Sequence, residues 1–175
     1  MGSVVLRPFE SRHLPLVEPW FADAETQRWL GGPDWPRQML ALATRPLGEF
    51  RGASEMGRFR WIGWSDDVPV GYVDAGTFDR WTTWDGERVV GVMDWPCTTL
   101  AFVVAPTLRR RGYGTALLDA MLAAPELGHV ELFGAGVEPG NVASVGCLLR
   151  AGFRALDADP DWEGFVYYVR SRTPP

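Results

Sequence analysis

The stretch Ala105-Pro-Thr-Leu-Arg-Arg-Arg-Gly-Tyr-Gly-Thr-Ala-Leu-Leu118 decides the fold, because it joins a strand-like segment to a helix-like segment. Residues 98–104 (TTLAFVV) are rich in β-branched and aromatic side chains, which is typical of a buried strand. Residues 113–124 have the composition of a helix, and Pro125 ends it. The chain therefore turns from strand to helix at this point.

Two glycines and three arginines lie at this junction. Gly112 and Gly114 let the backbone approach a ligand closely, and the first turn of a helix offers unpaired N–H groups to an anion. Arg109, Arg110 and Arg111 add charge and bidentate hydrogen bonding to phosphate. The junction predicts a polyphosphate site, although an arginine run is also common in solvated loops.

A second motif lies between Asn141 and Phe153 and reads NVASVGCLLRAGF. Pro139 and Gly140 precede Asn141 as a helix-start signal, and Gly152 is typical of a helix C-terminus. The second motif predicts a helix independently of the first.

Together the two motifs resemble those of the GNAT superfamily of acyl-CoA-dependent N-acyltransferases. The pyrophosphate loop of that family reads Q/R-x-x-G-x-G/A, and its later helix reads N-x-x-S/A and ends in G-F. Residues 4–9 (VVLRPF) and 68–72 (VPVGY) also resemble the family's first strand and central hairpin. The resemblance implies an α/β fold: a central mixed, mostly antiparallel sheet with splayed strands, flanked by helices. It also implies a single N-acetyltransferase domain over residues 1–175, with acetyl-CoA (coenzyme A) as cofactor.

The resemblance further implies which residues hold the cofactor. The pantetheine arm would pair with the main chain of residues 102–104 and 135–137. Asn141 could contact the arm or could cap the helix. Ser144 could contact the cofactor or could bond back to a backbone carbonyl. The expected cofactor-binding residues are Phe102, Val103, Val104, Arg109, Arg110, Arg111, Gly112, Tyr113, Gly114, Thr115, Asn141 and Ser144.

The family's reaction is direct attack of a neutral amine on a thioester carbonyl, which needs a base and an acid. Many members carry the acid as Tyr where this chain has Leu148, so water or the product ammonium is expected to protonate the thiolate. Residues 97–101 (CTTLA) lack the acidic base that several members place there. The nearest catalytic candidates are Asp94 and Asp74, although a solvated or hydrogen-bonded surface acid is the more common role for a carboxylate in either position.

Nine tryptophans are many for this length, and several lie in segments that the family uses for acceptor binding. With nearby acids they predict an aromatic, acidic pocket for a cationic amine, although tryptophan is commonly a core residue. The residues concerned are Trp20, Trp29, Trp35, Trp81, Trp84, Trp95, Asp34, Asp85 and Asp94.

Two branches of the superfamily resemble this chain. Residues 20–32 resemble the aminoglycoside N-acetyltransferases, and residues 139–144 resemble the N-terminal acetyltransferases of ribosomal proteins. The expected acceptor is therefore a small-molecule amine or a peptide N-terminus, with the small cationic amine favoured. A catalytically weak acyl-CoA-binding regulatory module is the alternative from another functional class.

Composition narrows the remaining classes. A chain of 175 residues with 46% hydrophobic content fits one domain, and its net charge of −5 argues against a nucleic-acid partner. Two cysteines and two histidines have no metal-site spacing, so no metal is expected. The sequence contains no run of about 18 apolar residues, so no membrane span is predicted. A cytoplasmic location is expected. Dimers are common in the family, so a homodimer is among the assemblies that the resemblance allows.

Other elements follow from local patterns. Ser11 is expected to cap a helix that ends at Phe21, and the turn-forming pair Asp66-Asp67 is expected to join a β-hairpin. The remaining expected segments are strands near 3–7, 129–137, 154–156 and 164–170, a helix over 37–44, and hairpin strands over 58–65 and 69–78. Residues 79–96 are expected to form an extended hairpin or an insertion, and residues 173–175 a frayed tail.

Overall fold

A two-residue turn at Asp66 and Asp67 joins the two longest strands, β3 (Ala53–Ser65) and β4 (Val68–Phe78). Both turn residues have a positive φ, 48° and 59°, as the commonest two-residue hairpin turn requires. The predicted hairpin is thereby confirmed. The computed structural model describes residues 3–172, so the tail expected to fray at 173–175 lies outside the described residues.

The sheet is mixed and mostly antiparallel, as expected, and its residues belong to two compact units. Strands β3, β4 and β7 (Cys97–Val104) contribute residues to both units. The first unit comprises residues 3–46, 59–74 and 101–124, and the second comprises 47–58, 75–100 and 125–172.

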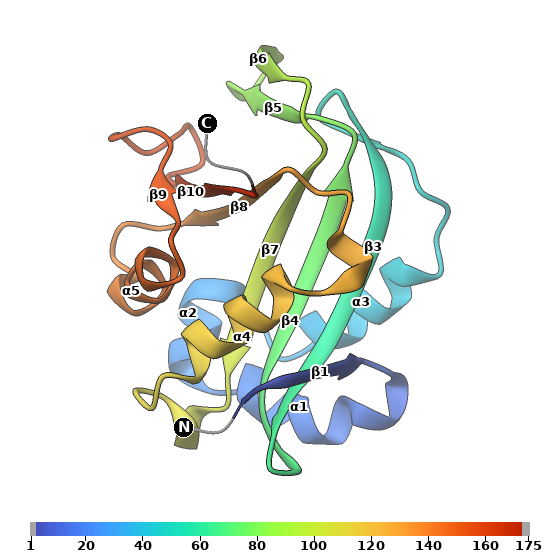
Figure 1. The fold of residues 1–175 in the computed structure, drawn as a ribbon, viewed down its shortest axis with the longest axis vertical. Coiled ribbons are helices and arrows are strands. Elements are labelled where there is room, and N and C mark those ends of the chain that lie inside the picture. Colours follow the sequence, from blue (N-terminus) through green and yellow to red (C-terminus); the bar gives the residue numbers. More distant parts are fainter. Residues whose placement is uncertain (1–2, 173–175) are drawn as a thin grey trace. The chain divides into compact units, whose positions relative to one another are not determined.

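In the first unit the strand order is β1-β3-β4-β7, and β1 (Val5–Pro8) pairs antiparallel with β3. Its helical elements are η1 (Ser11–His13), α1 (Leu14–Phe21), α2 (Ala24–Leu30), α3 (Trp35–Ala43), η2 (Pro106–Leu108) and α4 (Tyr113–Leu122), which Figure 1 labels except for η1 and η2.

Helices cover both faces of this part of the sheet. Gly63 and Gly71 make room for Leu117 of α4, because a Cβ on either glycine would lie 2.2 or 2.3 Å from a Leu117 methyl carbon. Their neighbours Ile62 and Tyr72 point to the opposite face, since side chains alternate along a strand. There they pack against buried residues of the N-terminal segment, α1 and β7, namely Phe9, Leu14, Val17, Phe21 and Val103.

In the second unit the order continues as β7-β8-β10-β9, with β2 (Glu49–Phe50) paired to β3. The first residues of β7 run parallel to β8 (Leu132–Val137), which pairs antiparallel with β10 (Val166–Ser171). Its other elements are β5 (Trp81–Trp84), β6 (Val89–Met93), η3 (Pro125–Leu127), α5 (Val142–Arg150) and β9 (Arg154–Ala155).

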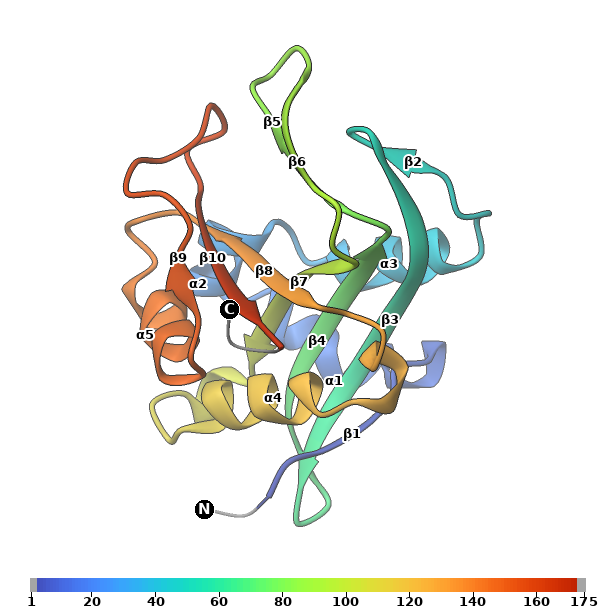
Figure 2. The ribbon, with the colours of Figure 1, turned by 45° about the horizontal axis from the view of Figure 1, so that its top comes forward.

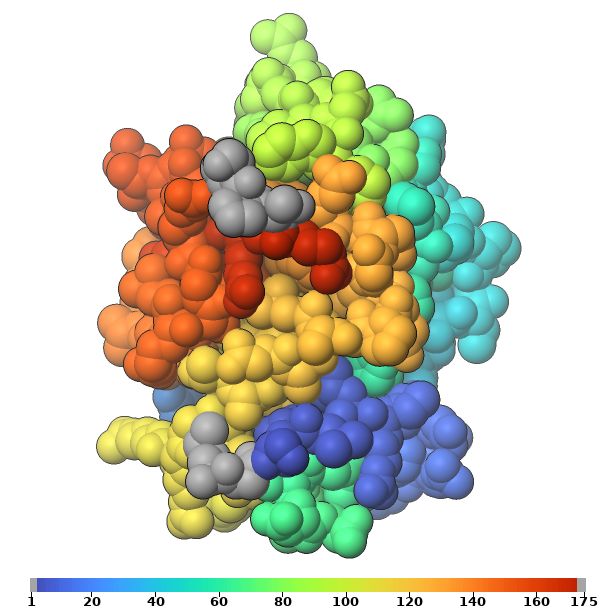
Figure 3. All heavy atoms as spheres, viewed as in Figure 1, coloured from blue at the N-terminus to red at the C-terminus, as the bar shows by residue number. Residues whose placement is uncertain are grey.

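Strands β5 and β6 form a separate two-stranded sheet (Figure 2). This confirms the hairpin expected over residues 79–96. Its tip, residues 85–88, is exposed and projects outward in the space-filling view (Figure 3), and Val90 of β6 is 54% exposed. Its base is anchored by Trp81, which is 6% exposed and packs with Phe78, Cys97 and Leu132.

Two local expectations were wrong, and one helix was missed. Glu10, rather than Ser11, occupies the cap position, because its carboxylate and His13 satisfy each other's backbone N–H groups. Strand β8 begins at Leu132 rather than at residue 129, since residues 128–130 form a turn that closes onto η3. Helix α2 was not predicted, because its seven residues lack a clear apolar period.

In the described part of the chain, no helix combines the length and apolar character that a membrane crossing needs.

Candidate active site

The junction between β7 and α4 has the backbone geometry of an anion-binding loop. Arg110 has a φ of 61° and Gly112, the N-cap of α4, has a φ of 84°. Among the described residues no side chain caps this helix, and its first turn contains no acid. The positive end of the helix dipole is therefore not neutralised locally and can act on an external anion.

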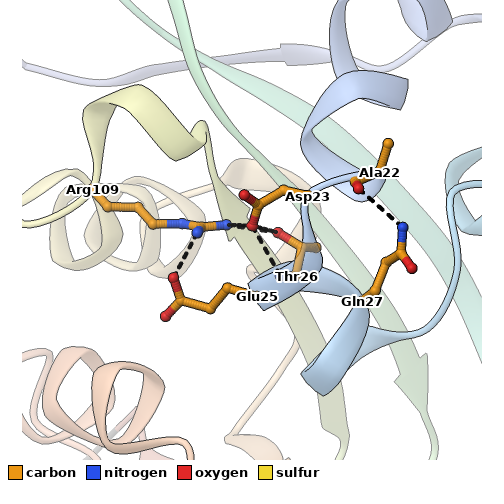
Figure 4. A network of polar contacts seen from close by, with 6 residues as sticks. All are labelled: Ala22, Asp23, Glu25, Thr26, Gln27 and Arg109. Carbon is orange, nitrogen blue, oxygen red and sulfur yellow. Dashed lines mark hydrogen bonds and ion pairs between the residues drawn. The ribbon is translucent and has the colours of Figure 1, made fainter.

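The guanidinium of Arg109 is held within the first unit rather than presented to solvent (Figure 4). Its Nη1 lies 2.7 Å from Glu25 Oε2, and its Nη2 lies 2.7 Å from Asp23 Oδ2. Hydrogen bonding from Arg109 is the main reason that the pKa of Asp23 is lowered. Of the three arginines in this run, Arg110 and Arg111 are exposed to solvent.

The second motif forms α5 as expected, and Asn141 is its N-cap. The side-chain oxygen of Asn141 accepts the backbone N–H of Ser144 at 3.2 Å, so the capping role weighed from the sequence is confirmed. Both residues are half-buried. Leu148, which stands where many relatives carry a tyrosine, is fully buried and cannot donate a proton.

Strand β8 is paired unequally along its two edges. All six of its residues pair with β10, but the ladder with β7 covers only Leu132, Phe133 and Gly134. In the described structure, one edge of residues 135–137 therefore has no partner in that ladder. In the first unit, Val103 of β7 is buried in the core, whereas Phe102 and Val104 are half-buried.

Asp74 lies in a buried polar cluster of the first unit. Its Oδ2 is 2.7 Å from Arg60 Nε and accepts the hydroxyl of Tyr72 at 3.2 Å. The Arg60 contact is an ion pair rather than an aligned hydrogen bond, because its Nε–H finds no acceptor in line among the described atoms. Burial raises the pKa of Asp74, and Arg60 only partly opposes this effect.

Asp94, the other candidate base, lies on the surface. Its side chain is 83% exposed, and its nearest cation is Arg80, whose Nη1 is 3.6 Å away. Two such exposed charges interact weakly in water. The structure therefore gives Asp94 the surroundings of an ordinary surface carboxylate.

A pocket of about 530 Å³ lies entirely within the second unit. Aromatic side chains from β2, β4, β5, β10 and the loop between β9 and β10 dominate its lining: Phe50, Phe78, Trp81, Trp84, Trp162, Phe165 and Tyr167. Four carboxylates join them, namely Asp85, Asp157, Asp159 and Asp161. Trp81 and Tyr167 meet edge to face, with ring centroids 5.4 Å apart.

The pocket has an excess of negative charge. Its two lining arginines are each paired with an acid outside the lining, Arg51 with Glu163 and Arg80 with Asp79. Asp157 and Asp159 are exposed, and among the described residues neither carboxylate has an ion-pair partner. A primary ammonium group is the ligand chemistry that aromatic faces and unpaired carboxylates favour.

This pocket agrees only in part with the one expected from the sequence. Trp81, Trp84 and Asp85 line it, but Asp94 and Trp95 do not. The remaining expected residues, Trp20, Trp29, Asp34 and Trp35, belong to the first unit, where Trp35 stacks on Phe21 in the core. Three lining acids, Asp157, Asp159 and Asp161, were not predicted, although the run DADPDW is a cluster of acids beside an aromatic residue.

Solved structures with a similar fold include two aminoglycoside acetyltransferases. A structure of AAC(6')-Ib with ribostamycin and coenzyme A superposes with a TM-score of 0.70 at 20% identity, covering 97% of this chain and 94% of that chain. An aminoglycoside N(6')acetyltransferase from Legionella pneumophila gives 0.69 at 13% identity, covering 98% of this chain and 93% of that one. At these identities the likeness concerns the fold.

Sequence comparison supports the same relationship. An uncharacterized N-acetyltransferase of Bacillus subtilis (strain 168), YfmK, is 33% identical over 72 residues, which is 41% of this chain and 49% of that relative. The match therefore spans about half the length of the curated relative. The model of the acetyltransferase (GNAT) domain family matches residues 3–154, a range that runs through both units. The chain therefore belongs to the GNAT acetyltransferase family.

Proposed function

We propose that this protein transfers an acetyl group from acetyl-CoA to a primary amine of a small cationic molecule. The observation that carries the acceptor class is the pocket of the second unit, where aromatic rings and unpaired carboxylates meet. Membership of the acetyltransferase family supports the reaction. The pocket volume of about 530 Å³ suits a small molecule.

The cofactor would be held by main-chain groups and two arginines. The uncapped first turn of α4, with the positive φ at Arg110 and Gly112, fits a pyrophosphate, and the exposed side chains of Arg110 and Arg111 can pair with it. The incompletely paired edge of β8 fits an extended, amide-containing arm. When bound, acetyl-CoA supplies the thioester that the amine attacks.

The remaining cofactor residues expected from the sequence keep that assignment as part of the proposal. Tyr113, Gly114 and Thr115 form the first turn of α4, and Asn141 and Ser144 begin α5. For Phe102, Val103 and Val104 of β7, the main-chain contact with the cofactor that the resemblance implies also remains part of the proposal. Arg109 is assigned a positioning role, because its guanidinium already binds Asp23 and Glu25 and holds the loop to the start of α2.

Of the two candidate bases, Asp74 is the stronger. Burial raises the pKa of its carboxyl, which makes the carboxylate a better proton acceptor, and Tyr72 and Arg60 fix its orientation. Asp94 lacks such surroundings. Because thiolate is a fair leaving group, positioning of the amine can supply a large part of the rate enhancement.

A free-thiol release assay tests the proposal directly. Acetyl-CoA is offered with aminoglycosides, polyamines, amino acids and ribosomal N-terminal peptides, and acetyl-CoA binding is measured in parallel by calorimetry. Thiol release with a cationic amine is the expected result. Release with peptides alone would identify a protein N-terminal acetyltransferase instead, and absence of acetyl-CoA binding would refute the cofactor site.

One observation favours a second candidate function. Leu148 is fully buried where many relatives carry a proton-donating tyrosine, which suits a catalytically weak acyl-CoA-binding regulatory module. Acetyl-CoA binding without release of free coenzyme A thiol in the presence of any amine would support that module. Cytoplasmic location and a homodimer, both expected from the sequence, stay predictions.

A further inference from the structure

Arg51 and Glu163 join two segments that are distant in sequence and both border the pocket. Arg51 Nη1 donates to Glu163 Oε2 at 2.8 Å, and Arg51 Nη2 donates to Glu163 Oε1 at 3.0 Å. The side chains are 25% and 29% exposed, so the pair is partly shielded from solvent. Such a bidentate fork is the strongest geometry for an arginine and a carboxylate.

Two aromatic rings hold the guanidinium in place. The Arg51 Cζ lies 4.9 Å from the ring centroid of Phe50 and 5.4 Å from that of Trp162. Both aromatic residues line the pocket, as does Arg51. The arginine therefore connects the turn between β2 and β3 to the loop between β9 and β10 through two residues of that loop, Glu163 and Trp162.

The backbone at Arg51 is unfavourable for an arginine. Arg51 and Gly52 form the two-residue turn between β2 and β3, and both have a positive φ, 50° and 79°. Asn, Asp and Gly are the usual residues in the first position of such a turn, because a longer side chain is disfavoured in the left-handed region. A residue that breaks a local rule in this way points to a function of its side chain.

The hairpin β5–β6 is the third segment that borders the pocket, besides the turn between β2 and β3 and the loop between β9 and β10. The backbone of all three segments can be followed in Figure 2. A Cβ on Gly52 would lie 2.8 Å from a methyl of Val89, so the turn packs directly on the hairpin. A Cβ on Gly86, at the hairpin tip, would lie 3.2 Å from the Trp162 ring. The turn, the hairpin and the loop that carries Glu163 thus brace one another in pairs.

We propose that the Arg51–Glu163 pair is a specificity-determining bridge that fixes the width of the pocket and so limits the size of the amine acceptor. This inference rests on the proposed function of the pocket as the acceptor site. With the bridge intact, the turn and the loop stay at a fixed separation and a bulky amine is excluded. Without it, the loop can move away and admit a larger acceptor.

Four variants test the bridge. Arg51→Asn removes the guanidinium while placing a favoured residue in the turn, and Glu163→Gln removes the charge with little change of shape. Arg51→Glu combined with Glu163→Arg restores a pair in reverse. Arg12→Asn is the matched control, because it deletes an exposed ion pair, Arg12 with Glu10, outside the pocket.

The measurements are calorimetric binding of putrescine and of kanamycin, and kcat/KM for both amines. Arg51→Asn and Glu163→Gln are expected to raise the preference for the larger amine roughly tenfold, the size of effect that a small change in pocket shape produces. The exchanged pair should return the preference toward that of the wild type. Arg12→Asn should leave the preference for the larger amine unchanged. The affinity for acetyl-CoA should be the same in all four variants and the wild type.

An unchanged preference in both single variants would overturn the bridge. If the wild type binds the amines but releases no thiol, the proposed function fails, while the binding ratio still decides the role of the bridge. If the wild type binds neither amine, the pocket is not an acceptor site and both proposals are refuted.

Discussion

Arg109 and Asp23 meet at 2.7 Å between Nη2 and Oδ2, on the same carboxylate oxygen that accepts the Thr26 N–H at the start of α2. One carboxylate therefore caps a helix and anchors the loop that follows β7. Arg109 also donates to Thr26 Oγ1 at 2.7 Å. The arginine run thus contains one structural member followed by two exposed ones.

We expect Arg109→Ala to lower the free energy of unfolding by about 1–2 kcal/mol, because it removes charged hydrogen bonds that are only about a quarter exposed. Arg110→Ala should leave stability unchanged and weaken acetyl-CoA binding instead. Urea denaturation and calorimetry separate the two effects. Equal destabilisation by both variants would contradict the division of roles.

The paired substitution Asp157→Asn with Asp159→Asn should raise KM for a polycationic amine roughly threefold to tenfold, as expected for two exposed charges worth up to about 1 kcal/mol each. The effect should shrink at high ionic strength, because salt screens exposed charges. Glu126→Gln serves as control, since Glu126 is exposed and does not line the pocket. An equal rise of KM in the control would place the acceptor elsewhere.

Asp74→Asn is expected to destabilise the protein by about 3–5 kcal/mol, because it leaves the 5% exposed side chain of Arg60 without its counter-charge. Adding Arg60→Met should recover part of that loss, since no buried charge then remains, and the amide oxygen introduced by Asp74→Asn can still accept the Tyr72 hydroxyl. Denaturation of the single and double variants measures both steps. If Asp74 is also the base, the double variant will be stable but slow in kcat.

Glu55 gives a pH-dependent prediction. Hydrogen bonding from Arg58 is the main cause that lowers the pKa of Glu55, and the Gly48 N–H also donates to its Oε2 at 3.0 Å. A depressed carboxyl pKa stabilises the folded state above the unfolded pKa, and this stability is lost as pH falls below about 4. Glu55→Gln should therefore be about 1–2 kcal/mol less stable at pH 7 and close to the wild type at pH 3. If the two proteins still differ in free energy of unfolding at pH 3, the ionised Glu55 carboxylate is not the source of the stability.

The sequence predicts the features that depend on neighbouring residues. Asp66 and Asp67 predict a hairpin turn because their own backbone preferences favour it, and Asn141 predicts a helix start because its side chain reaches only three residues onward. The family match also confirms the resemblance drawn from the two motifs.

Contacts between distant residues could not be predicted in the same way. Asp23 lies 86 positions before Arg109, and nothing local indicates that the two meet. The same holds for the acids of residues 157–161, which reach Trp81 and Trp84 only through the pairing of β10 with β8 and of β8 with β7. Arg51, in a turn that disfavours it, gave a weak local signal that sequence reasoning did not use.

The unequal pairing of β8 has a consequence for hydrogen exchange. Among the described residues, Ala135, Gly136 and Val137 are bonded through one edge to β10, while the other edge lies beyond the short ladder with β7. Amides on that edge should take up deuterium from solvent faster than those of Leu132 to Gly134. A ligand that completed the edge would slow this uptake. Deuterium labelling, followed by mass spectrometry of this single strand, would therefore report occupancy without an acceptor or any turnover.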